Sequence, residues 1–192
     1  GVEGGILQMI NHGIITGALF LYVGMIYERT HSRMIDDYGG LFKTIPVFTV
    51  FFAIFTLAAI GFPGMNAFVG EFLIISGAFK ANMIIAAFSI LGVVLGVCYM
   101  VWLYYRIAMN EVNPSTESRL FDLEFREIAT LVPLVVLVFF IGVQPSVLLS
   151  YMHVSVAHLL EQVNSAVSVE SFNLHDSESL IAQYVKEIFG WV

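Results

Sequence analysis

The stretch from Ile45 to Phe79, IPVFTVFFAIFTLAAIGFPGMNAFVGEFLIISGAF, is almost entirely apolar. It is longer than the roughly 20 residues that one straight crossing of a bilayer requires. Gly61-Phe62-Pro63-Gly64 interrupts its middle, and Glu71 is its only ionisable residue. A carboxyl group in hydrocarbon costs about 2.5 to 3.5 kcal/mol on insertion scales. The pattern therefore indicates a broken membrane segment in which Glu71 has a functional role.

The interruption predicts a discontinuous helix. Pro63 lacks an N–H and clashes with the carbonyl four residues earlier, which costs about 3 kcal/mol inside a helix. Gly61 and Gly64 add backbone freedom on either side. We expect two half-helices joined by an unwound loop at membrane depth, which is tolerated where protein or a wet cavity satisfies the freed backbone groups. Asn66 is expected to cap the second half-helix.

Glu71 falls in the second turn of that second half-helix. Desolvation disfavours the charged form of a buried carboxyl group. A carboxyl group balanced between its two forms can take up and release a proton, as a relay in a broken transport helix requires. The alternative interpretation is a permanently protonated glutamate that only holds two helices together.

The composition defines the class of protein. The chain is 58% hydrophobic and 12% charged, with a mean hydropathy of +0.86. Soluble domains carry about 25% charged residues, so we predict an integral membrane protein. Part of the net charge of -7 comes from acidic residues in the last third, which would solvate a tail and do not indicate a nucleic-acid partner.

The sequence predicts no cofactor in this chain. Cys98 is the only cysteine, which excludes an internal disulfide and a cysteine-held metal or iron–sulfur cluster. No glycine-rich phosphate loop lies between a strand and a helix. His153 and His158 are five residues apart and do not share a helical face, so we interpret them and His31 as surface residues.

The expected fold is all-α, a polytopic transmembrane helix bundle of about four spans. The spans are predicted at about 4–27, 45–79, 83–106 and 128–149, with the second one broken at Gly61-Gly64. An interfacial amphipathic helix is expected at about 150–163. A polar C-terminal tail is expected at 164–192.

Two GxxxG pairs are predicted to pack against neighbouring helices, namely Gly13 with Gly17, supported by Gly24, and Gly92 with Gly96. His12 lies about halfway along the first span. An imidazole there is either hydrogen-bonded to a neighbour or relays protons, since its ordinary pKa of about 6.5 allows both charge states. Both interpretations stay open.

The distribution of positive charge predicts an orientation. The two loops beyond the first and third spans carry Arg29, Arg33, Lys43, Arg106, Arg119 and Arg126, whereas the opposite side carries only Lys80 and Lys186. The positive-inside rule then puts those loops in the cytoplasm, or on the equivalent matrix side, and both ends of the chain outside. A bacterial plasma membrane is the expected location. Because Gly1 is not an initiator Met, we interpret the chain as a fragment of a longer polypeptide.

Two segments carry a family resemblance. INHGIITGALFLYVGMIYERTHSR at residues 10–33 and TLAAIGFPGMNAFVGEFLI at residues 56–74, with Gly39 and Gly40 between them, resemble subunit M (chain 4) of proton-translocating NADH:quinone oxidoreductase, respiratory complex I. The resemblance covers about Gly4 to Val163. It implies an antiporter-like subunit built from inverted repeats, of which this chain would hold the last four helices.

The resemblance also implies roles and partners. Glu71 would be the glutamate of the discontinuous helix at the end of a membrane-centre proton path, and His12 the histidine of the preceding helix. The other relay residues would lie in a missing N-terminal part of the subunit. The implied partners are lipid and the other membrane subunits, including sister antiporter-like subunits that commonly have lysine in place of Glu71. FMN and iron–sulfur clusters would belong to other subunits.

We therefore expect a membrane-arm subunit that translocates protons, coupled to electron transfer from NADH to quinone elsewhere in the complex. The alternative is a subunit of a multisubunit cation/proton antiporter or of a membrane-bound hydrogenase with the same fold. A third hypothesis is a structural membrane scaffold without transport.

Overall fold

The computed structural model describes residues 1–114 and 118–189, and only the backbone of residues 168–189. Within these ranges every regular element is helical, which confirms the all-α prediction. The elements are α1 (Val2–Thr30), η1 (Ile35–Asp37), α2 (Leu41–Thr44), α3 (Pro46–Ala59), α4 (Asn66–Ala81), α5 (Met83–Tyr104), the π-helical turn η2 (Tyr105–Met109), α7 (Phe125–Val143) and α8 (Ser146–Phe189). The chain divides into a bundle at residues 1–149 and a second unit at residues 150–192.

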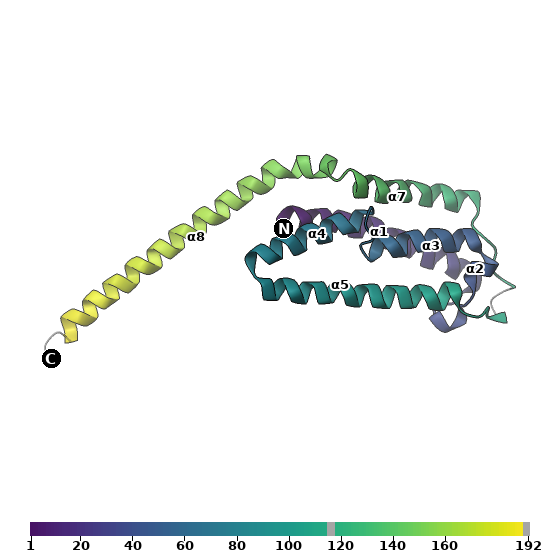
Figure 1. The fold of residues 1–192 in the computed structure, drawn as a ribbon, viewed down its shortest axis with the longest axis horizontal. Helices are drawn as coiled ribbons and strands as arrows, with labels where there is room; N and C mark the ends of the chain where they lie inside the picture. The colour runs from purple at the N-terminus through teal and green to yellow at the C-terminus, as the bar shows by residue number, and fades with distance from the viewer. Residues whose placement is uncertain (115–117, 190–192) are drawn as a thin grey trace. The chain divides into compact units, whose positions relative to one another are not determined.

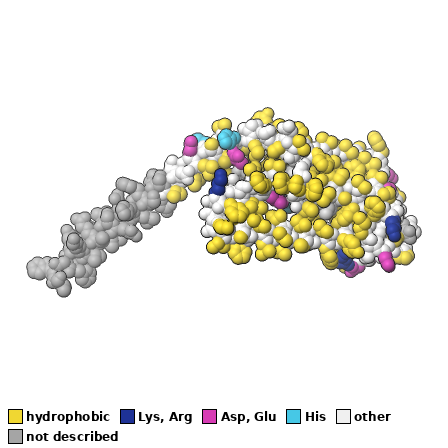
Figure 2. Space-filling model, viewed as in Figure 1, with side chains coloured by type: hydrophobic (Ala, Val, Ile, Leu, Met, Phe, Trp, Pro, Cys, Tyr) yellow, Lys and Arg dark blue, Asp and Glu magenta, His cyan; other side chains and the backbone are white. Residues whose placement is uncertain are grey.

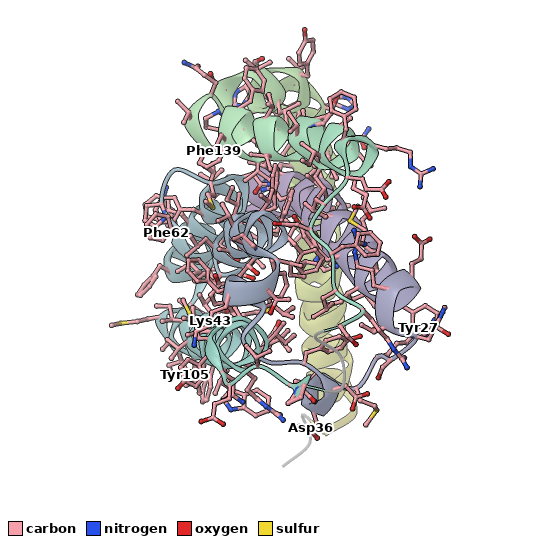
Figure 3. The ribbon with its side chains drawn as sticks, turned by 90° about the vertical axis from the view of Figure 1, so that its right-hand side faces the viewer. Tyr27, Asp36, Lys43, Phe62, Tyr105 and Phe139 are labelled. Carbon is pink, nitrogen blue, oxygen red and sulfur yellow. The ribbon has the colours of Figure 1, made fainter. Side chains whose placement is uncertain are left out.

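The long helices of the bundle run back and forth between two ends. Figure 1 shows that α1, the α3 and α4 pair, α5 and α7 alternate in direction, so that the segments around η1 and before α7 lie at the same end. Both Figure 1 and Figure 3 show α7 and α5 on opposite sides of the bundle. Among the described residues, three stretches are long and apolar enough to span a membrane: Val2–Thr30, Met83–Met109 and Phe125–Val143. Together with the shorter apolar α3, they make a multi-pass membrane bundle.

The bundle core lies along one face of α1. Its buried residues recur every three or four positions, as expected for a helix that packs along one stripe. The ring of Tyr22 packs edge-on against Phe48, with the ring centroids 4.9 Å apart, and also contacts Phe52 and Phe55. The visible outer surface of the bundle is mostly hydrophobic, as Figure 2 shows, which suits a lipid or protein environment.

The predicted break is present. α3 ends at Ala59 and α4 begins at Asn66, and the backbone between them has positive φ at Gly61 (68°) and at Gly64 (90°). The ring of Phe62 is 50% exposed and points away from the bundle in Figure 3. The prediction that Asn66 caps the half-helix is wrong. Met65 holds the cap position without a side-chain cap bond, because Asn66 is drawn in as the first buried residue of α4.

The predicted glycine packing is also wrong for the described residues. A Cβ added at Gly13, Gly17, Gly24 or Gly92 would meet nothing within 4 Å outside its own helical backbone. The close approach occurs instead between α1 and α4. A Cβ at Gly4 would lie 2.6 Å from Leu73 Cβ and 3.0 Å from the Gly70 carbonyl oxygen, so these glycines bring the two backbones together.

Three boundaries differ from the expected ones. α1 continues to Thr30, so Glu28 and Arg29, expected in a loop, are helical. α7 begins at Phe125, three residues before the expected start at about residue 128. α7 ends at Val143, and the helix that follows, Ser146–Phe189, runs through both the expected interfacial helix and the expected tail. The side chains of residues 168–189 and all of residues 190–192 lie outside the described part.

Candidate functional site

Glu71 lies directly against the break. A Cβ at residue 61 would collide with Oε2 of Glu71 and would lie 3.1 Å from its Cδ. Gly61 also has a φ of 68°, a region that L side chains rarely occupy. Glycine is therefore needed at residue 61 twice, once for the backbone and once for the space that the carboxyl group fills. The acid and the break form one local structure.

A chain of side-chain amides leads to Glu71 from the other side. Gln8 Nε2 donates to Glu71 Oε1 at 3.3 Å, and Asn11 Nδ2 donates to Gln8 Oε1 at 3.3 Å. Asn11 Nδ2 also donates to the Asn66 carbonyl oxygen at 2.8 Å. These contacts connect α1 to both the start and the second turn of α4. We refer to Gln8, Asn11, Asn66 and Glu71 as the amide chain.

Several buried polar atoms of the bundle, including three of the amide chain, have no hydrogen-bond partner among the described residues. They are Asn11 Oδ1, both amide atoms of the Asn66 side chain, Thr56 Oγ1 and the Tyr22 hydroxyl. Both asparagines are fully buried. Buried polar atoms in folded proteins are normally satisfied by protein groups or ordered water. The interior beside Glu71 is thus polar enough to bind water in an otherwise apolar bundle.

A cavity of about 350 Å³, open to the outside of the described bundle, also borders Glu71. It is lined by Glu71 itself, by the end of α3 at Ala59 and Ile60, and by α5. The α5 contribution consists mainly of small or polar residues, namely Ser89, Gly92, Gly96 and Tyr99 together with two valines. The glycines that were expected to pack a helix therefore leave open space beside the carboxyl group.

The structure does not bring His12 to Glu71. His12 is exposed, whereas its neighbour Asn11 points into the bundle, and one step along a helix turns the side chain by about 100°. No hydrogen bond among the described residues joins His12 to Glu71. Gly61, Asn66 and Glu71 do come together, and Gln8 and Asn11 join them without having been predicted. Two amides three residues apart in an apolar span were the available signal, because that spacing puts them on one face.

A second polar cluster lies at the loop end of the bundle and is centred on Arg29, which is 8% exposed. Nη1 and Nη2 donate to the two carboxylate oxygens of Glu127. The remaining donors bind the carbonyl oxygens of Met25, Phe121 and Asp122, so all five N–H groups of the guanidinium have partners. We call this cluster the Arg29 clamp. It connects the end of α1 to the start of α7.

Asp122 extends the clamp to α3. Its carboxylate accepts hydrogen bonds from the backbone N–H groups of Val47 and Phe48, both at 2.9 Å. These are donors that the first turn of a helix leaves free, and a negative group there is favoured by the helix dipole. Asp122 therefore caps α3 from a distant part of the sequence.

Tyr38 closes the loop at the same end. Its hydroxyl lies 2.6 Å from Thr30 Oγ1 and donates to the Ser32 carbonyl oxygen at 2.6 Å. Burial raises the pKa of Tyr38 above its ordinary value, which the hydrogen bond with Thr30 partly opposes. The ring stays neutral at physiological pH and holds the turn after α1.

Comparison with known proteins identifies relatives of this chain. The chain is 43% identical over 161 residues to NADH-ubiquinone oxidoreductase chain 4 of Marchantia polymorpha, which covers 84% of this chain and 32% of the relative. It is 42% identical over 165 residues to NADH-quinone oxidoreductase subunit M of Rhodobacter capsulatus, covering 86% of this chain and 32% of the relative. The chain spans about a third of the length of these relatives.

Two solved structures share the fold. Respiratory complex I from Thermus thermophilus with bound NADH matches with a TM-score of 0.70 and 33% identity, over 74% of this chain and 30% of the other chain. The membrane-bound sulfane sulfur reductase, an archaeal respiratory membrane complex, matches with a TM-score of 0.68 and 25% identity, over 74% and 24%. The family model described as NADH:quinone oxidoreductase/Mrp antiporter, TM, matches residues 1–97, which include α1, the break and the amide chain. The chain therefore belongs to the NADH:quinone oxidoreductase/Mrp antiporter transmembrane family.

Proposed function

We propose that this chain is the C-terminal part of a membrane-arm subunit of NADH:quinone oxidoreductase and that it relays protons through Glu71. Electron transfer from NADH to quinone would take place in other subunits, which would hold the FMN and the iron–sulfur clusters. The remainder of the subunit and its sister membrane subunits are the proposed partners. Similarity to subunit M and chain 4 proteins over most of this chain supports the proposal.

The observation that carries the proposal is the position of Glu71. Its carboxyl group lies between a helix break, a donor amide and a cavity of about 350 Å³, inside an apolar bundle. Glu71 is half-buried, and a carboxyl group with a hydrogen-bond donor on one side and open space on the other can change protonation without a large rearrangement. A residue that only held two helices together would need no such cavity.

We propose His12 as a second relay residue that acts through neighbours outside the described residues. Its side chain is exposed on the face of α1 that faces away from the core. An imidazole on a membrane helix requires a polar partner or a wet environment, which another part of the subunit would supply. His12→Ala should therefore reduce pumping in the complete complex without weakening the amide chain.

The test of the proposal is Glu71→Gln in the complete complex, reconstituted into vesicles. The variant keeps the shape and the hydrogen bond from Gln8 but cannot release a proton. We expect assembly to survive while the number of protons pumped per NADH oxidised falls strongly. Glu161→Gln, the same change at an exposed site on α8, is the matched control. Normal pumping and quinone reduction by Glu71→Gln would exclude the proposed role.

Glu71→Lys tests what the site requires. A lysine would keep a titratable group, but it is positive when protonated and neutral when deprotonated, whereas a glutamate is neutral when protonated and negative when deprotonated. Partial pumping by this variant would mean that a titratable group is sufficient. Complete loss would mean that the acid itself, together with its donor amide, is needed.

One observation favours a second function. The structural match to the sulfane sulfur reductase complex is nearly as good as the match to complex I, so a role in a cation/proton antiporter or in a hydrogenase-like membrane complex is the alternative. Purification of the complex decides between them. NADH:quinone reductase activity in the preparation supports the first function, and its absence alongside hydrogenase or sodium/proton exchange activity supports the second.

A further inference from the structure

We propose that Gln8 is a positioning residue that commits Glu71 Oε1 to accepting a hydrogen bond, so that the relayed proton is carried on Oε2 and is exchanged through the cavity beside α5. This inference rests on the proposed function of Glu71. It assigns a role to Gln8 on α1, and it states which carboxylate oxygen of Glu71 exchanges the proton.

The direction of the hydrogen bonds in the amide chain is fixed by the backbone carbonyl of Asn66. The Asn66 backbone carbonyl can only accept, so Asn11 must present its NH₂ group there. The same NH₂ group donates to Gln8 Oε1, which turns the Gln8 amide so that its own NH₂ group faces Glu71. Each orientation thus follows from the previous one. Reversing the Gln8 amide would bring two acceptors together at Glu71 and two NH₂ donors together at Asn11.

The helix surfaces are shaped to hold this arrangement. A Cβ at Gly70 would lie 3.2 Å from both Asn11 Nδ2 and Gln8 Cβ and would collide with Gln8 Oε1. The glycine on α4 therefore provides the space that the two amides from α1 occupy. Gly4, which also lies against Gly70, keeps the two helices close along the next turn. These contacts limit how far Gln8 can rotate away from Glu71.

The other carboxylate oxygen faces a different environment. Oε2 is the atom of Glu71 nearest to the position of a Cβ on Gly61, on the side of the break. Ala59 and Ile60, just before the break, line the cavity together with Glu71, and Ser89 and Gly92 complete it from α5. A hydroxyl or water molecule in such a space can accept or deliver a proton, whereas the Gln8 amide can only donate a hydrogen bond to Oε1.

The proton step follows from this asymmetry. In the neutral acid, Oε1 is the carbonyl oxygen that accepts from Gln8 Nε2, and the O–H bond is at Oε2. Release breaks that O–H bond and passes the proton to an acceptor in the cavity, which leaves the carboxylate with Oε1 still bound by Gln8. Uptake reverses these changes.

Gln8→Met tests the role of Gln8 because methionine has a similar size and no N–H donor. In redox-induced infrared difference spectra of the complete complex, the C=O stretch of protonated Glu71 is the band that disappears in Glu71→Gln. We expect Gln8→Met to shift this band to higher wavenumber, since the carbonyl loses its donor, and to reduce pumping. Gln144→Met, the same change at an exposed site after α7, should leave both unchanged. Gln8→Asn, which shortens the donor by one methylene, gives the same shift if Gln8→Met does not assemble.

The outcomes separate the two proposals. A Glu71 band that does not move in Gln8→Met or Gln8→Asn overturns the role of Gln8 and leaves the proposed function standing. A wild-type complex with no Glu71 band in the difference spectrum overturns the proposed function itself, and the inference with it.

The cavity side has its own test. Gly92→Leu fills part of the cavity that Glu71 lines but leaves Gln8 in place, so we expect loss of most of the pumping with the position of the Glu71 band unchanged. Val94→Leu enlarges a 50% exposed residue of α5 that does not line the cavity and is the matched control. Equal pumping by the two variants would overturn the proposed exchange through this cavity.

Discussion

The guanidinium of Arg29 binds both carboxylate oxygens of Glu127, with Nη1 2.9 Å from Oε1 and Nη2 2.7 Å from Oε2. This paired geometry joins residues 98 positions apart in the sequence. Removing one partner of a buried ion pair costs about 3 to 5 kcal/mol, because the other charge is left uncompensated. We expect Arg29→Met to lower the melting temperature of the complex and the yield of assembled subunit. The double variant Arg29→Met, Glu127→Leu should recover part of this loss.

The pair between Arg106 and Asp36 provides the control for the Arg29 clamp. The Asp36 side chain is 76% exposed, and exposed ion pairs contribute about 0 to 1 kcal/mol. Asp36→Asn should therefore change the melting temperature very little. Equal losses for Asp36→Asn and Arg29→Met would contradict the structural importance assigned to the clamp.

Gly61→Ala and Gly64→Ala separate backbone strain from contact with Glu71. Both glycines have positive φ, so each alanine pays about 1 to 2 kcal/mol of strain. Only at Gly61 would the new methyl group collide with the carboxyl group, since nothing lies within 4 Å of a Cβ at Gly64. We expect similar melting temperatures for the two variants and a strong loss of pumping for Gly61→Ala alone. Equal pumping would mean that the position of Glu71 does not depend on Gly61.

Gly4→Ala and Gly5→Ala form a matched pair on adjacent residues of α1. Alanine in a helix is favoured over glycine by about 1 kcal/mol, and a Cβ at Gly5 meets no neighbour. At Gly4 the methyl group would press on the backbone of α4, and overpacking of this kind costs about 1 to 3 kcal/mol. Thermal unfolding of the complex should show Gly5→Ala as neutral or stabilising and Gly4→Ala as destabilising. The opposite order would rule out the close approach of α1 and α4.

Asp122→Ala removes the cap of α3. Loss of a helix cap costs about 0.5 to 2 kcal/mol, and the first turn of α3 should open more often. Hydrogen exchange at the amides of Val47 and Phe48 measures this directly. We expect faster exchange at these two amides with little change in the second half of α3. Unchanged exchange rates would mean that these amides have other partners.

The loop end of the bundle is expected to face the cytoplasm or the equivalent matrix compartment. The loops before α3 and before α7 lie at this end, and six of the eight lysine and arginine residues belong to these loops or to the helical turns that adjoin them. In a Cys98→Ala background, a membrane-impermeant thiol reagent applied from the inner side should label Lys43→Cys but not Lys80→Cys. Labelling with the opposite sidedness would reverse the orientation.

The break and its acid could be predicted because their causes are local. Pro63 and its flanking glycines disrupt a helix whatever surrounds them, and an ionisable residue in an apolar segment is visible without a structure. The role of Asn66 could not be read in this way. Its side chain fits the rule for a cap, but the packing of α1 against α4 buries it one position further on.

Contacts between residues far apart in the chain could not be predicted from the sequence. The positions of Gln8 and Asn11 were visible, but their contact with Glu71 depends on how α1 and α4 are aligned against each other. The GxxxG rule failed because a residue that permits close packing is not always packed. It identifies residues that permit close packing, and at Gly13 and Gly92 no described segment takes that opportunity.

The capping of α3 by Asp122 has a consequence for folding during synthesis of the protein. Val47 and Phe48 leave the ribosome long before Asp122, which lies 75 and 74 positions later. At a synthesis rate of about 5 to 20 residues per second, the first turn of α3 waits about 4 to 15 seconds for its cap. During that interval the N–H groups of Val47 and Phe48 lack their Asp122 acceptor. The fold at the loop end is thus completed only when α7 follows the earlier helices into the bilayer.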